Sequence, residues 1–331
     1  MDNGYIDFFA QQNYAKKQQE KQEIRKLGLL TGGALISFVI LQNVLFYVLV
    51  LFGLQNKYFS DPIFQTGIEI IFSVLSILLP FMFFGKAIKS QTAMTTIVPC
   101  GKPNDRVLSA LAIPAGLGIC MAANIISSIF VTIMQATGYE LSSPDIANPQ
   151  GIFGFIVSLT RVSVAAAMIE EIAFRGYAMQ PLRKYGDFFA IVMSACTFGL
   201  MHGNLIQAPF ALIAGIGLGY ICVKTNSIWP SIIVHCLNNS ISITVSYLLG
   251  SGIISDNALN FAYGTIVYAL IIIGVPALIA FVKRSNNISP TYNGSSLLTA
   301  GEKALAYITN PTMILAIIYM LFTTAKFVTR R

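Results

Sequence analysis

Long apolar runs recur along this chain of 331 residues, and each is close to the length that crosses a lipid bilayer. A helix needs about 20 consecutive apolar residues to cross the hydrocarbon core. Strands of a membrane barrel would alternate apolar and polar residues, and these runs do not alternate. Because backbone groups inside lipid must find their hydrogen-bond partners within the protein, the runs predict an all-α fold, a polytopic membrane helix bundle.

Nine runs qualify as candidate transmembrane helices, and we expect eight or nine of them to span. They cover residues 27–54, 63–84, 107–136, 152–174, 188–202, 208–223, 228–249, 261–282 and 312–327. The status of the last run stays open, because it is short and because Arg330 and Arg331 would follow it on the outer side. We therefore divide the chain into a polar tail at 1–26 and a transmembrane domain at 27–331.

The composition supports the membrane class. Hydrophobic residues make up 55% of the chain and charged residues 11%, whereas soluble domains carry roughly a quarter charged residues. The net charge of +7 comes from basic residues gathered at the ends of the apolar runs. That pattern indicates membrane orientation rather than nucleic-acid binding. The five cysteines show no paired spacing, so neither a disulfide framework nor a thiolate metal site is indicated.

The distribution of basic residues predicts the orientation of the spans. Five basic residues precede the first run: Lys16, Lys17, Lys21, Arg25 and Lys26. They indicate an uncleaved anchor and a cytoplasmic N-terminus. The loop after the third run carries Glu140 and Asp145 but no Lys or Arg, so we expect it outside. We predict an integral, multi-pass protein of the plasma membrane, in contact with membrane lipid.

Ionisable residues inside the apolar runs mark the candidate functional site, because such groups are costly in lipid. The fourth run ends in the sequence Glu170-Glu171-Ile-Ala-Phe-Arg175. On a helix Glu171 lies one turn from Arg175 and can pair with it, while Glu170 points about 100° away. We expect Glu170 to face a cavity, where a carboxylate can act as a general base. The alternative is that both acids lie in water at the membrane surface.

The only two histidines, His202 and His235, also lie in apolar runs. Taken singly, each could be a packed or interfacial residue. Asn239 follows His235 by one helical turn, so one helix face presents an imidazole and an amide. These groups could stabilise an oxyanion or bond between helices. The joint occurrence of both histidines, the acid pair and Asn239 in this part of the chain favours a water-activating site.

Other polar or small residues in the runs have a structural explanation. Arg161 lies in the middle of the fourth run and could pair with an acid, extend toward the membrane surface or line a wet cavity. Asn124 is expected to bond between helices rather than to touch substrate. Gly215, Gly217 and Gly219 are expected to allow close helix packing rather than to bind a dinucleotide.

Three motifs follow one another: Glu-Glu-x-x-x-Arg from Glu170, Phe-x-x-x-His ending at His202, and His-x-x-x-Asn from His235. With these motifs, residues 150–250 resemble the CAAX prenyl endopeptidase and bacteriocin-processing family of intramembrane proteases. The resemblance implies a four-helix catalytic core at about 152–249 inside the larger bundle. All three motifs are intact, while the flanking runs match only in being apolar.

The resemblance implies an intramembrane endopeptidase that hydrolyses a peptide bond of a membrane-associated or lipidated substrate. Glu170 and His202 would activate the water, and His235 and Asn239 would stabilise the tetrahedral oxyanion. Glu171 and Arg175 of the first motif would support these four side chains. We expect the cavity to open toward the cytoplasmic side and to lipid.

The metal content stays open at this point. Members of the family are usually called metalloproteases, and His202, His235 and Glu170 could hold zinc with one position left for water. The soluble protease signature His-Glu-x-x-His is missing from the sequence. Water activated by Glu170 alone is the other interpretation, so the sequence does not require a cofactor.

Two other functions stay open as well. A non-proteolytic membrane partner or scaffold, of the bacteriocin-immunity type, would be favoured by decay of a motif. A transporter or channel would use Glu170, Glu171 and His202 as a proton relay, but the internal repeats typical of many transporters are not visible. The sequence identifies neither the substrate nor the oligomeric state.

Overall fold

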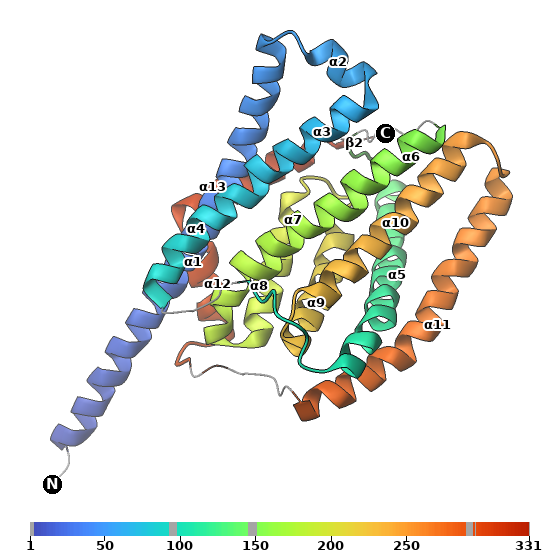
Figure 1. The fold of residues 1–331 in the computed structure, drawn as a ribbon. Helices are drawn as coiled ribbons and strands as arrows, with labels where there is room; N and C mark the ends of the chain where they lie inside the picture. Colours follow the sequence, from blue (N-terminus) through green and yellow to red (C-terminus); the bar gives the residue numbers. More distant parts are fainter. Residues whose placement is uncertain (1–2, 93–97, 145–150, 289–293, 295, 331) are drawn as a thin grey trace.

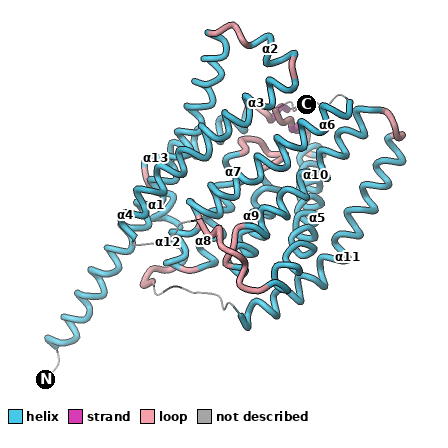
Figure 2. Tube along the Cα trace, viewed as in Figure 1, coloured by secondary structure: helices cyan, strands magenta, loops and turns pink. Residues whose placement is uncertain are grey.

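The structure is a computed structural model that describes residues 3–92, 98–144, 151–288, 294 and 296–330. Nearly all of these residues are helical, and the helices form one bundle from which the start of α1 projects (Figures 1 and 2). Seven helices in the described part of the chain are long and apolar enough to cross a membrane, or up to 8 if a bent pair counts as one span. The prediction of an all-α, polytopic bundle is therefore confirmed.

The N-terminal part of the chain forms an arm of long helices. In chain order the arm contains α1 (Asn3–Leu51), α2 (Gln55–Ser60), α3 (Pro62–Ser73), the π-helix η1 (Val74–Leu78) and α4 (Leu79–Thr92). Asp61 accepts hydrogen bonds from the backbone N–H groups of Ile63 and Phe64, and this cap starts α3. The expected tail at 1–26 is, from residue 3 onward, the first half of α1.

The core follows the arm. Its elements are α5 (Arg106–Ala136), β1 (Tyr139–Leu141), α6 (Gly151–Ser158), η2 (Leu159–Ala166), α7 (Ala167–Glu171), η3 (Ile172–Ala178), η4 (Gln180–Tyr185), α8 (Asp187–Met201), α9 (Ala208–Thr225), α10 (Trp229–Ser251) and α11 (Asp256–Ile288). The elements from α6 to η4 follow one another as a single rod of 35 residues. Within this rod η2 and η3 are π-helical. Wide turns of this kind are frequent at functional sites.

The chain ends in two helices that are bent against each other by 79°, α12 (Ala300–Ile308) and α13 (Pro311–Ala325). The run at 312–327, whose status the sequence left open, is the second half of this bent pair. After α13, the strand β2 (Val328–Arg330) pairs antiparallel with β1. The end of the described chain therefore lies beside the end of α5 (Figure 1).

The predicted run at 188–202 is the apolar helix α8, which is only 15 residues long. At 1.5 Å per residue it reaches about 22 Å, less than the roughly 30 Å of the hydrocarbon core. The next helix, α9, returns after a turn at 202–207. The count of spans is lower than nine because α8 is too short to be one of them.

Small residues let the core helices approach closely. A Cβ atom at Gly274 of α11 would lie 2.6 Å from the Cα atom of Gly118 on α5. A Cβ atom at Gly217 of α9 would lie 2.7 Å from Cγ2 of Ile119. A side chain at either position would have to displace its neighbour. The expectation that Gly217 serves close helix packing is therefore confirmed.

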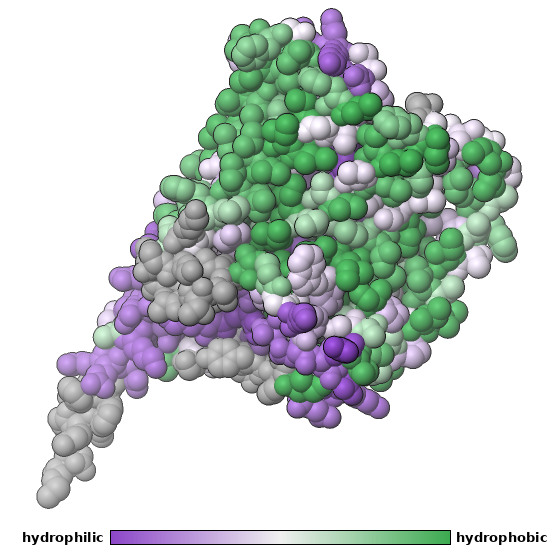
Figure 3. All heavy atoms as spheres, in the orientation of Figure 1, coloured by the Kyte–Doolittle hydropathy of each residue, from purple (hydrophilic) through white to green (hydrophobic). Residues whose placement is uncertain are grey.

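Hydrophilic residues gather at one end of the bundle, below a wide hydrophobic surface (Figure 3). At this end Arg284 pairs with Asp105 at 2.6 Å, and Lys184 pairs with Glu23 at 2.6 Å. We call this the basic end, and it includes the start of α8 and the end of α9. We call the opposite end, where α5 and α10 end and β1 pairs with β2, the far end.

Candidate functional site

A cavity of about 820 Å³ lies in the core between α5, the rod from α6 to η4, and the helices α8 to α10. Glu170, His202, His235 and Asn239 all line it. These four side chains come from the rod, from the end of α8 and from α10. The fold thus brings together four of the six residues that the sequence predicted for the site.

The two adjacent acids have different surroundings. Glu170 lines the cavity, and 17% of its side chain is exposed. Glu171 is fully buried and pairs with the buried Arg175, with 3.1 Å between Oε1 and Nη1. The guanidinium of Arg175 also lies 4.6 Å from the centroid of the Phe198 ring. The remaining two predicted residues therefore lie behind the cavity wall, as the helical spacing predicted for Glu171.

His235 connects the two acids. Its Nδ1 lies 2.9 Å from Oε1 of Glu171, and because a carboxylate oxygen accepts, Nδ1 carries the proton. Its Nε2 lies 3.7 Å from Oε2 of Glu170, which lines the cavity. A ring held in this way donates from Nε2 only when it carries its second proton.

Phe198 supports both histidines. Its carbonyl oxygen accepts a hydrogen bond from Nδ1 of His202 at 2.9 Å. Its ring meets the His202 ring edge-on at 4.9 Å and the His235 ring at 6.1 Å. In the neutral ring of His202 the proton therefore lies on Nδ1, and Nε2 can accept a hydrogen bond from water. The Phe-x-x-x-His motif thus has a physical reason, since its first residue fixes the orientation of the last.

Asn239 is held by the π-helical stretch η2. Its Nδ2 donates to the carbonyl oxygen of Val162 at 3.0 Å. Its Oδ1 accepts a hydrogen bond from Nδ2 of Asn238 at 3.3 Å. These two bonds orient the amide plane and leave one N–H of Asn239 for another acceptor. The oxyanion role expected from the sequence therefore depends on a single amide hydrogen.

Asn238 and Asn124 also line the cavity, although the sequence assigned neither to the site. Asn238 is 4% exposed, and its Oδ1 has no hydrogen-bond partner among the described residues. The doubled Asn after His235 was the available signal for Asn238, because neighbouring amides can bond to each other. Asn124 was expected to bond between helices, and the structure places it in the cavity wall.

The described residues do not form a metal site, since no three His, Cys, Asp or Glu side chains among them group closely enough to hold an ion. His235 uses its Nδ1 for Glu171, and His202 uses its Nδ1 for Phe198, so each ring offers only Nε2. Histidines that bind zinc also donate their other ring N–H in this way, so the rings themselves would suit a metal. The grouping of both histidines with Glu170 does not fit the zinc site that the sequence allowed.

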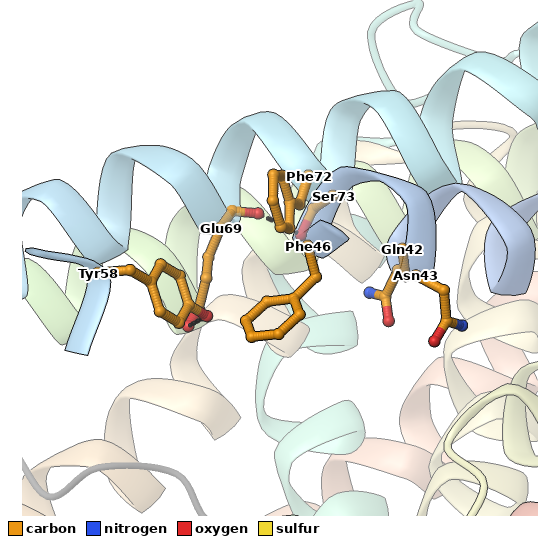
Figure 4. A pocket seen from close by; sticks show the side chains of 7 residues that line it. All are labelled: Gln42, Asn43, Phe46, Tyr58, Glu69, Phe72 and Ser73. Carbon is orange, nitrogen blue, oxygen red and sulfur yellow. Dashed lines mark hydrogen bonds between the residues drawn. The ribbon is translucent and has the colours of Figure 1, made fainter. Parts of the chain in front are cut away.

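A second cavity, of about 360 Å³, lies in the arm between α1, α2 and α3 (Figure 4). Within it the hydroxyl of Tyr58 donates to Oε1 of Glu69 at 2.9 Å. The other oxygen of Glu69, Oε2, pairs with Arg161 of η2. Of the three roles considered for Arg161, the structure selects pairing with an acid. Both carboxylate oxygens are engaged by donors, so Glu69 is poorly placed to activate water.

The comparison with protein families selects the same segment as the geometry. Residues 152–241 match the family model of the type II CAAX prenyl endopeptidases, Rce1-like. No curated protein and no solved structure was found to match the chain. The matched segment includes the four side chains that converge on the core cavity. Over residues 152–241, which are about a quarter of its length, the chain is therefore similar to the Rce1-like CAAX prenyl endopeptidases.

Proposed function

We propose that this protein is an intramembrane endopeptidase in which Glu170 activates a water molecule for attack on a peptide bond. The main support is the convergence of Glu170, His202, His235 and Asn239 on one cavity inside a membrane bundle. The family assignment supports a membrane protease at the family level. The substrate of this proposal is a membrane-associated or lipidated peptide.

The reaction begins at Glu170. Its carboxylate takes a proton from the water while the water oxygen attacks the carbonyl carbon of the peptide bond. His202 orients the same water by accepting its second hydrogen at Nε2. The carbon–nitrogen bond of the tetrahedral intermediate then breaks, and Glu170 returns its proton to the leaving nitrogen. The products are a carboxylic acid and an amine, and the scheme uses no cofactor.

The oxyanion of the intermediate needs hydrogen-bond donors. Asn239 supplies its remaining N–H, and a doubly protonated His235 supplies Nε2–H. Glu171 accepts from the other ring nitrogen and balances the charge of the ring, and Arg175 neutralises Glu171 when the ring is neutral. A donor of this kind contributes roughly 3–4 kcal/mol to the stability of a transition state.

The proposal includes the membrane topology expected from the sequence. Residues 1–26 lie in the cytoplasm, residues 27–331 form the domain in the plasma membrane, and the catalytic core is at about 152–249. The clustering of charged residues at the basic end supports this orientation (Figure 3).

The test is cleavage of quenched fluorescent peptides by the purified full-length protein in liposomes. One peptide carries a C-terminal farnesyl group, and the other is tethered by an apolar helix. We expect the wild type to cleave at least one of them, and Glu170→Gln to be about 10²–10⁴-fold slower because it lacks the base. The control Glu140→Gln makes the same chemical change on β1, outside the cavity, and should keep the wild-type rate.

Two results would contradict the proposal. One is equal cleavage by wild type and Glu170→Gln. The other is a folded wild type that cleaves neither peptide, which would favour a non-proteolytic role.

A further inference from the structure

The α8–α9 hairpin stops well before the far end of the bundle. Ser127 of α5 donates to the carbonyl oxygen of Ile206 at 3.1 Å and thereby ties the hairpin turn to α5. From Ser127, α5 continues to Ala136, which adds about 14 Å of helix. The long helices therefore extend past the turn and leave a recess between the turn and the far end.

The core cavity extends from Glu170 into this recess. Its wall runs from Cys120 to Thr132 on α5 and from His235 to Ser246 on α10. At 1.5 Å per residue these stretches are about 18 and 17 Å long. The wall becomes more exposed in the same direction, since Cys120 and His235 are buried, Ser246 is half-buried and Thr132 is exposed. The cavity wall is therefore more accessible toward the far end than at Glu170.

The cavity is closed toward the basic end. Glu171 and Arg175, which are 0% and 1% exposed, lie between Glu170 and that end of the rod. Behind them Gln180 donates to the carbonyl oxygen of Arg175 at 2.9 Å and lies 3.7 Å from Sγ of the buried Cys222. A substrate that came from the basic end would have to break this buried polar layer.

The wall of the recess combines apolar side chains, such as Val131 and Ile243, with uncharged polar groups. It presents the hydroxyl and amide groups of Asn124, Ser128, Thr132, Ser242 and Ser246, and no Lys or Arg occurs among the described lining residues. These groups can bond to the N–H and C=O groups of a peptide main chain. The apolar side chains of Val131 and Ile243 can contact the side chains of such a peptide. The wall therefore suits an extended peptide that carries apolar side chains.

From this geometry we infer that the cavity takes an extended peptide segment from the far end, and that the far end faces away from the cytoplasm. The helix ends and loops at the basic end carry Lys102, Arg183, Lys184, Lys283 and Arg284. By the positive-inside rule these residues place the basic end in the cytoplasm. The substrate class is then a peptide or membrane-protein segment exposed on the outer side. The cleavage of that segment rests on the proposed function, and the outward opening replaces the cytoplasmic opening expected from the sequence.

Thiol labelling of the full-length protein in intact cells tests the direction of opening. The starting variant replaces Cys120, Cys196 and Cys236 by Ala and keeps Cys100, which is exposed at the basic end, and the buried Cys222. Adding Ser246→Cys places a thiol on the wall of the recess. We expect a membrane-impermeant maleimide to label Ser246→Cys in intact cells and to label Cys100 only after the membrane is opened.

The side from which substrate is cleaved supplies the second measurement. A peptide displayed on the outer surface of the cell should be cleaved, whereas the same peptide displayed in the cytoplasm should not. Labelling of Ser246→Cys only after permeabilisation, or on neither side, would overturn the inference. Cleavage of only a cytoplasmic farnesylated peptide would overturn it as well. Outside labelling without any cleavage would refute the protease function and leave the outward opening in place.

Discussion

At the scale of single residues, the site is a row of paired charges that ends in one acid facing the cavity. Arg175 pairs with Glu171, Glu171 accepts from His235, and His235 reaches to within 3.7 Å of Glu170. A buried charge costs less when an opposite charge lies beside it. The row therefore explains how so many ionisable groups can lie inside a membrane bundle.

Removal of Arg175 tests this pairing. The variant Arg175→Met should lose roughly 3–5 kcal/mol of unfolding free energy, because it leaves the carboxylate of Glu171 buried without its cation. Thermal unfolding of the full-length protein in detergent measures the change. The double variant Glu171→Gln, Arg175→Met should recover most of the loss, since no uncompensated charge remains. If Arg175→Met is as stable as the wild type, the pair does not contribute this unfolding free energy.

At the scale of elements, contacts between α5 and α11 hold one side of the core together. Gly118 and Gly274 let the two backbones touch, and the ion pair of Asp105 with Arg284 joins the start of α5 to the end of α11. The first contact depends on the absence of a side chain, and the second depends on a charge. Two different changes therefore probe the same helix pair.

Gly274→Ala tests the close approach. Its Cβ atom would lie 2.6 Å from the Cα atom of Gly118, so we expect a loss of about 1–3 kcal/mol in unfolding free energy. The matched control is Gly264→Ala on the same helix, where no atom lies within 4 Å. That variant should be neutral or gain about 0.5–1 kcal/mol, because alanine favours helix. Equal effects at both positions in thermal unfolding would argue against the contact.

The ion pair of Asp105 with Arg284 makes the thermal stability depend on pH. Hydrogen bonds from Arg284 and from the backbone N–H of Leu108 hold the pKa of its carboxyl at about 2. Because this folded-state pKa lies below the ordinary value, the stabilisation is present above about pH 4 and is lost as the pH falls toward 2. Asp105→Asn should therefore lower the Tm at pH 7, and its difference from wild type should shrink below about pH 4. A difference that stays constant down to the lowest pH would contradict this.

At the scale of the whole molecule, the arm and the core meet at an ion pair inside the bundle. Glu69 of α3 pairs with Arg161 of η2. Tyr58 donates to the same carboxylate (Figure 4). Arg161 lies in the segment of the family match, whereas Glu69 and Tyr58 lie outside it. The arm is thus attached to the core by residues that the family motifs do not include.

Arg161→Met should loosen this attachment. The change keeps the apolar stem and removes the cation, so Glu69 is left with the donor Tyr58 among the partners described here. We expect faster hydrogen exchange in α2 and α3 and little change in α8 and α9, because local opening follows local loss of contacts. Adding Glu69→Gln should restore part of the protection. Faster exchange throughout the core would show instead that the pair supports the entire fold.

The sequence by itself determined the fold class and the different surroundings of the two acids. A run of about 20 apolar residues has essentially one stable solution in lipid, the helix. Helical rotation is a local property, so the spacing of Glu170, Glu171 and Arg175 was enough to predict that Glu171 would pair and Glu170 would face elsewhere. The family motifs added His202, His235 and Asn239, and all three lie in the cavity wall.

The tertiary structure alone decided the membership of the cavity wall, the length of α8 relative to its neighbours and the direction in which the cavity opens. Asn124 and Asn238 belong to the wall because of the way α5 and α10 are rotated in the bundle, which no periodicity within either helix records. The recess exists because the hairpin turn meets α5 at Ser127, a contact between residues 79 positions apart. Contacts of this range depend on the packing of the whole chain, whereas a sequence pattern reports only the few residues within its own turn or strand.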